Sequence, residues 1–169
     1  MITKAKRDAL IAWLRELKNL QPHHFLTGLL PHGQGFIDAV PVLLDALPQI
    51  LRIDRATLDK SRGSLDAIDK AMRRLGYDCV LDPNVIAPLI AYVGEVVRAA
   101  TNGSWEMRLA SDDETWEPWV VATGGEAYGI FFFVGEIINT GRVISVRNHI
   151  EGQLGAARLY SMFRKETIN

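Results

Sequence analysis

The sequence of 169 residues predicts an α+β fold, with about five helices packed on a small antiparallel sheet of three to four strands. Helical patterns fill residues 1–101, strand patterns are confined to residues 104–133, and one more helical pattern follows at residues 146–165. Because helices and strands do not alternate along the chain, a parallel doubly wound sheet is disfavoured. We expect one domain spanning residues 1–169.

The predicted helices before the sheet differ in how their apolar residues are spaced. Three of them carry one apolar stripe at helical spacing, and the fourth is apolar around almost its whole circumference, which predicts a central position. We expect Asp38 and Ser64 to cap the second and third helices, Gly76 to end the third, and Pro48 to kink or split the second. These four helices are predicted at residues 3–19, 38–51, 64–75 and 86–100.

Alternation of apolar and polar residues predicts a hairpin followed by a third strand. The first strand includes Trp105, Met107 and Leu109, the second spans residues 116–122, and the third spans residues 128–132. Pro118 favours an edge position or a bulge for the second strand, because proline cannot donate a hydrogen bond to a neighbouring strand. A short helix ending at Gly141 and a last helix at residues 146–165 complete the chain.

Composition indicates an ordinary globular protein. Hydrophobic residues make up 48% and charged residues 23%, and 19 basic residues face 20 acidic ones, so no overall charge attracts nucleic acid or an anionic membrane. Charges interrupt the first 20 residues, which therefore lack the apolar core of a signal peptide, and one cysteine excludes an internal disulfide. We expect a cytoplasmic protein that binds neither nucleic acid nor membrane.

The loop between the first two strands holds an acidic cluster beside two tryptophans. Aromatic anchors surrounded by charge are common at protein interfaces, so this face is a candidate for binding a basic protein partner. The alternative is a solvated hairpin tip with at least one tryptophan in the core. The predicted partner-binding residues are Asp112, Asp113, Glu114, Trp116, Glu117 and Trp119.

Glu95 is the candidate catalytic residue, because it lies in an otherwise apolar helix. If its side chain points inward, desolvation would raise its pKa and suit it to general acid or base catalysis. With Arg98 or Arg108 it would then serve a small hydrolase or transferase. The alternatives are an exposed Glu95 paired with Arg98, and a buried structural pair with a strand arginine.

No further motif predicts chemistry. His23, His24 and His32 share a loop without metal-ligand spacing, and no phosphate loop, nucleophile elbow or zinc pattern is present. We therefore predict no catalytic residue beyond the candidate Glu95, no cofactor and no metal. We expect Cys79 to be an inert core thiol. The small face of Gly152 and Gly155 suggests a second alternative function, a structural homo-oligomer subunit.

Three segments resemble a pattern in small uncharacterised bacterial cytosolic proteins. They are Ser64-Leu65-Asp66-Ala67-Ile68-Asp69, Ala91-Tyr92-Val93-Gly94-Glu95-Val96 and Gly103-Ser104-Trp105-Glu106. Some of the similar proteins occur in toxin and immunity settings, and the resemblance implies no catalytic residues. It favours a bacterial protein of the immunity type, which would occlude its partner by steric and electrostatic means.

Overall fold

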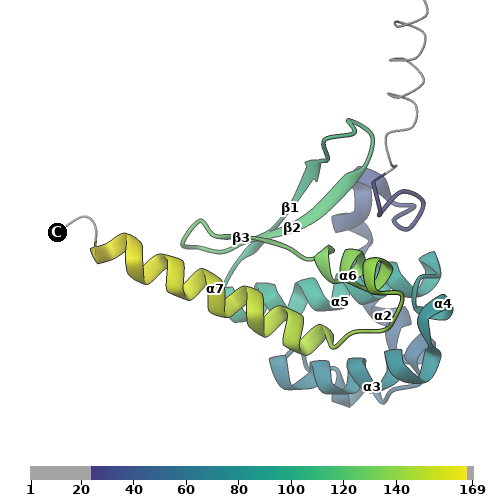
Figure 1. Cartoon of the computed structure of the whole chain (residues 1–169). Coiled ribbons are helices and arrows are strands. Elements are labelled where there is room, and N and C mark those ends of the chain that lie inside the picture. Colours follow the sequence, from purple (N-terminus) through teal and green to yellow (C-terminus); the bar gives the residue numbers. More distant parts are fainter. Residues whose placement is uncertain (1–23, 167–169) are drawn as a thin grey trace, which may run out of the picture.

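The computed structural model describes residues 24–166, and the predicted helix at residues 3–19 lies outside them. The described chain forms six α-helices and one three-stranded antiparallel sheet, which confirms the predicted α+β class (Figure 1). The elements are α2 (Phe36–Leu51), α3 (Leu65–Leu75), α4 (Tyr77–Val80), α5 (Pro83–Thr101), β1 (Ser104–Leu109), β2 (Trp116–Val121), β3 (Ala127–Gly129), α6 (Phe132–Thr140) and α7 (Val146–Glu166), with 3-10 turns η1 (Gly33–Gly35), η2 (Arg55–Thr57) and η3 (Arg62–Ser64).

Helix α5 is the central element, as its apolar circumference predicts. Every residue from Ile86 to Val97 is buried, and the helix packs against α2, α4 and the first two strands. The side chain of Asp82 caps its N-terminus by accepting a hydrogen bond from the backbone N–H of Asn84, and Asn102 ends it in the left-handed conformation. The two caps fix where α5 starts and where it stops, shortly before β1 begins at Ser104.

Helix α2 starts earlier than predicted and is not split. It begins at Phe36, so Asp38 lies in the first turn and does not cap the helix, and it continues three residues beyond Pro48 to Leu51. The guanidinium of Arg74 in α3 donates a hydrogen bond to the carbonyl oxygen of Leu51. This bond satisfies a carbonyl that the end of α2 leaves without a helical partner.

Helix α7 is anchored by acidic residues of α3. The buried carboxylate of Asp69 accepts hydrogen bonds from the Ser145 hydroxyl at 2.5 Å and from the Val146 backbone N–H at 2.7 Å. Asp69 therefore caps the N-terminus of a helix more than 70 residues away, and Asp66 binds Arg147 beside it. Gly76 ends α3, as predicted for the third helix.

The sheet corrects two predictions. The strand order is β1-β2-β3, so β2, which contains Pro118, is the central strand. The sequence had led us to expect Pro118 in an edge strand or at a bulge. Proline has no N–H to donate to β3, but few hydrogen bonds are lost because the pairing of β2 with β3 ends at Gly129. The Pro118 carbonyl still accepts a hydrogen bond from the Ile130 N–H at 3.3 Å. The third strand ends at Gly129 instead of residue 132, since the chain turns there into α6, whose end at Gly141 is confirmed.

Gly94 allows the hairpin to pack closely on α5. A Cβ atom at this position would lie 1.8 Å from Cη2 of Trp105, so the indole of β1 occupies the space that any other residue would fill. The Trp105 ring also packs edge-to-face against Phe36 of α2, with ring centroids 6.0 Å apart. One tryptophan thus joins α2, α5 and the hairpin.

We predict that Gly94→Ala destabilises the fold by about 2 kcal/mol or more, because overpacking a rigid contact costs roughly 1–3 kcal/mol. Urea unfolding followed by circular dichroism measures the change. Gly152→Ala is the matched control, since Gly152 is an exposed helical glycine whose added Cβ meets nothing within 4 Å. It should stabilise by up to about 1 kcal/mol. Equal effects of the two substitutions would show that the Gly94 contact is not tight.

Candidate functional site

The hairpin of β1 and β2 reaches beyond the helices, and its loop forms the outermost end (Figure 1). Ser111 to Glu114 are all exposed, and Asp113 adopts a left-handed backbone conformation with φ of 58°. Asp is one of the residues that tolerate this conformation in turns. The predicted polar tip is therefore present as a tight, acidic loop.

Asp112 holds this loop in shape. Its carboxylate accepts hydrogen bonds from the Thr115 hydroxyl at 2.6 Å, the Thr115 N–H at 2.9 Å and the Glu114 N–H at 3.0 Å. These bonds, the hydroxyl of Thr115 first, lower the pKa of Asp112 to about 2. The side chains of Asp113 and Glu114, in contrast, make no hydrogen bond or ion pair with any described residue.

Glu117 and Trp119 have partners within the molecule. One oxygen of Glu117 lies 2.9 Å from Nε2 of His24, and the other accepts from the Trp119 indole N–H at 3.1 Å. Since Nδ1 of His24 accepts from the Leu26 N–H at 3.2 Å, the ring proton lies on Nε2 and is donated to Glu117. The Trp119 ring packs edge-on against Phe131 and Phe132, with centroids 5.6 Å apart.

Trp116 stands at the outer end of the hairpin, opposite Leu109 on β1. It is half-buried near Gly33, and Leu109 is 45% exposed, one of the few large apolar side chains on the described surface. Sequence reasoning missed Leu109, because the alternation that half-buries Trp105 and Met107 places it on the same face. Within residues 24–166 the hairpin extends past the helices at this end, and no local sequence pattern encodes that placement.

The predicted binding residues thus divide into two groups. Asp113, Glu114 and Trp116 lie at the free end of the hairpin with Leu109, whereas Asp112, Glu117 and Trp119 are used to hold the hairpin in shape and in place. We call the first group, Leu109, Asp113, Glu114 and Trp116, the hairpin end.

Glu95 is buried, with 6% of its surface exposed, and this corrects the expectation of an exposed side chain. Its Oε1 accepts from Nε of Arg98 at 2.8 Å and from the Trp105 indole N–H at 2.9 Å. Its Oε2 accepts from a terminal nitrogen of Arg98 at 2.9 Å and from Nζ of Lys60 at 3.2 Å. The expected pairing with Arg98 is confirmed, and both carboxylate oxygens are fully used.

These donors also reverse the expected direction of the pKa. The hydrogen bond from Arg98, with those from Trp105 and Lys60, outweighs burial and lowers the pKa of Glu95 from 4.5 to about 2. Burial alone would have raised it. Glu95 is therefore a stable anion at neutral pH, without a proton to donate and with no oxygen open to accept one.

A hydroxyl chain continues from this cluster to η3. Ser64 donates its only hydroxyl proton to the Ser61 carbonyl at 2.6 Å, so the Tyr92 hydroxyl, 2.6 Å from Ser64 Oγ, must donate to Ser64. Tyr92 in turn accepts from the Lys60 N–H at 3.1 Å, and burial raises its pKa. Ser64, Tyr92, Gly94, Glu95 and Trp105 belong to the three segments quoted for the resemblance, and they meet here.

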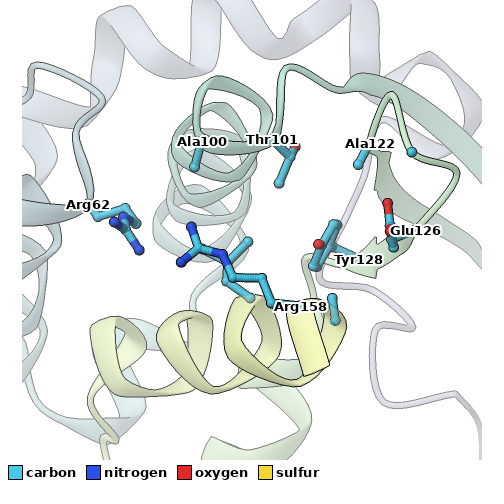
Figure 2. A pocket seen from close by; sticks show the side chains of 10 residues that line it. Arg62, Ala100, Thr101, Ala122, Glu126, Tyr128 and Arg158 are labelled. Atoms are coloured by element: carbon cyan, nitrogen blue, oxygen red, sulfur yellow. The ribbon is translucent and has the colours of Figure 1, made fainter. Parts of the chain in front are cut away.

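Two surface pockets lie away from the hairpin. One, of about 320 Å³, lies between the end of α5, the turn after β2 and α7, and the Arg158 side chain extends across it toward Arg62 (Figure 2). Arg62 binds Glu151 at 3.0 Å and Glu126 also lines the wall, so charges of both signs meet there. The other, of about 490 Å³, includes the pair of His149 Nδ1 and Glu136, 2.8 Å apart.

The described residues contain neither a cluster of metal ligands nor a membrane-spanning helix. No three His, Cys, Asp or Glu side chains among residues 24–166 gather as ion ligands, and His23 lies outside that range. No described helix combines the length and apolarity needed to cross a bilayer. Cys79 is exposed at the end of α4, which corrects the expectation of a core thiol.

Comparisons of the chain with family models, with curated proteins and with solved structures found no match. The site must be interpreted from its own residues.

We predict that the stability contributed by Glu95 depends on pH in one direction. Its pKa of about 2 in the folded chain lies below the unfolded value of 4.5, so the stabilisation is present above pH 4.5 and is lost as the pH falls toward 2. Glu95→Gln should remove roughly 3 kcal/mol at pH 7, at about 1.4 kcal/mol per pKa unit. Urea unfolding at pH 7, 5 and 3 should show the difference from wild type shrinking with acidity.

Glu114→Gln is the control for this experiment, since its carboxylate is exposed and has no described partner. It should change the unfolding free energy by less than about 0.5 kcal/mol at each pH. A constant deficit of Glu95→Gln from pH 7 to pH 3 would mean that Glu95 is not held as an anion.

Proposed function

We propose that the protein binds a basic protein partner through the hairpin end and acts by occluding that partner. The observation that carries the proposal is that two carboxylates without a partner among the described residues, Asp113 and Glu114, lie beside the exposed Leu109 and the half-buried Trp116. A small apolar centre beside charge is the composition of a binding hot spot. The resemblance of the three segments supports a bacterial, cytoplasmic protein of the immunity type.

The charge of the loop favours a basic partner. Residues 110–115 contain Asp112, Asp113 and Glu114 and no basic residue. The nearest arginine of the strands, Arg108, is engaged with Glu106 at 2.7 Å and lies over the Trp119 ring at 4.6 Å. An uncompensated negative end steers association with a positive surface and raises the association rate at low salt.

Rigidity of the loop supports the same function. The three hydrogen bonds to Asp112 hold the tip in one shape, and Glu117 fixes the base of β2 to His24. A preorganised surface loses less conformational entropy on binding. Asp112 and Glu117 would therefore contribute to affinity by holding the loop in shape, without contacting the partner themselves.

The two rival functions receive less support. A hydrolase or transferase would need Glu95 to exchange a proton, and its lowered pKa and four donors oppose this. A homo-oligomer built on Gly152 and Gly155 is supported only by the open space around both glycines, where a second copy could pack.

We predict that neutralising the hairpin end weakens binding. In a pull-down from a bacterial lysate, wild-type chain should retain a basic protein that Asp113→Asn/Glu114→Gln and Trp116→Ala retain poorly. Calorimetry with that protein should give a dissociation constant at least about tenfold higher for each variant, since central aromatic anchors contribute more than about 1.4 kcal/mol. Asn at residue 113 keeps the left-handed turn.

The control is Asp38→Asn/Asp78→Asn, which removes the same charge at two exposed positions on α2 and α4. It should bind like wild type. Equal weakening by the control would reduce the effect to net charge, and unchanged affinity of both hairpin variants would refute the proposal.

A further inference from the structure

A third pocket, of about 300 Å³, lies between α2 and the chain from η2 to Lys60. This volume is at the lower end of the range for small-molecule sites, roughly 300–1,000 Å³. Four of its lining residues are apolar, and α2 supplies three of them. They are Pro41, Leu44, Pro48 and Leu58.

Lys60 and Tyr92 form the polar part of this pocket. The Lys60 side chain is 45% exposed, and its ammonium group has one described partner, Glu95, at 3.2 Å. The backbone of Lys60 is in the left-handed conformation, with φ of 62°, and its N–H is held by the Tyr92 hydroxyl. The backbone of Lys60 is thus held in place, and two of the three hydrogens of its ammonium group remain for another acceptor.

Two cations, Arg55 and Lys60, and one carboxylate, Asp45, line the pocket. Glu95 is one anion shared by two cations, and Arg98 binds it through two nitrogens at 2.8 and 2.9 Å, closer than Lys60. The carboxylate that lines the pocket, Asp45, is bound by Arg55 at 2.8 Å. Asp59 adds an anion whose field reaches Tyr92, so the excess positive charge among the described residues is that of the lining itself, where Arg55 and Lys60 face Asp45.

From this arrangement we propose that the pocket binds a small carboxylate with an apolar body. The carboxylate would accept charge-assisted hydrogen bonds from the Lys60 ammonium, and the apolar body would cover Leu44, Leu58 and the two prolines. This site is separate from the hairpin end and does not depend on the function proposed for it.

The test uses 3-phenylpropionate as the probe and isothermal calorimetry with the full chain. We expect saturable 1:1 binding below about 10 mM, with 3-phenylpropan-1-ol at least about tenfold weaker, because the alcohol keeps the apolar body but has no charge. Lys60→Met should weaken binding of the acid about tenfold and leave the alcohol unchanged, and Lys60→Arg should retain the acid.

A second pair of variants tests the apolar part without touching the cluster around Glu95. Leu44→Trp should fill the pocket and abolish binding, whereas Val42→Trp, on an exposed position of the same helix, should not. Circular dichroism confirms that each variant is folded. Absence of saturable binding, equal affinity for acid and alcohol, or unchanged binding to Lys60→Met and Leu44→Trp would each overturn the proposal.

Discussion

The carboxylate of Glu95 determines how the hairpin of β1 and β2 and the segment before α3 meet the central helix α5. It lies in the central helix, receives the indole N–H of Trp105 from β1, and binds Lys60 from the segment that precedes α3. A buried carboxylate is costly unless hydrogen bonds and charges compensate it, and here two cations and an indole do so. The hairpin, α5 and the 52–64 connection are therefore positioned relative to one anion.

The packing around that anion explains the small and aromatic residues beside it. Gly94 leaves room for the Trp105 ring, and without that room the indole nitrogen would not reach Glu95. Asp69 is a second buried carboxylate that joins distant segments, because it caps the N-terminus of α7. Ser64, Tyr92, Gly94, Glu95 and Trp105, from the three segments quoted in the sequence analysis, thus meet in packing and hydrogen bonds that the fold requires, and the hairpin end lies outside these segments.

Much of the fold was predictable because its signals are local. The apolar circumference of α5, the glycine at the end of α3 and the alternation in β1 each report a neighbourhood of a few residues. The predictions that were wrong concern residues whose placement depends on distant contacts. Glu95 is buried because Lys60 and Trp105 reach it. Pro118 is tolerated in the central strand because β3 ends early. The site was predictable in its charged tip, while Leu109 and the pocket at Lys60 needed the placement of α2 and the hairpin.

A double-mutant cycle between Glu95 and Trp105 tests this account most directly. Glu95→Gln, Trp105→Phe and the double variant would be compared with wild type by urea unfolding at pH 7. The account predicts a coupling free energy above about 1 kcal/mol, as expected for two groups joined by a buried charge-assisted hydrogen bond. Additive effects within about 0.3 kcal/mol would contradict it, because the carboxylate would then not hold the hairpin on the central helix.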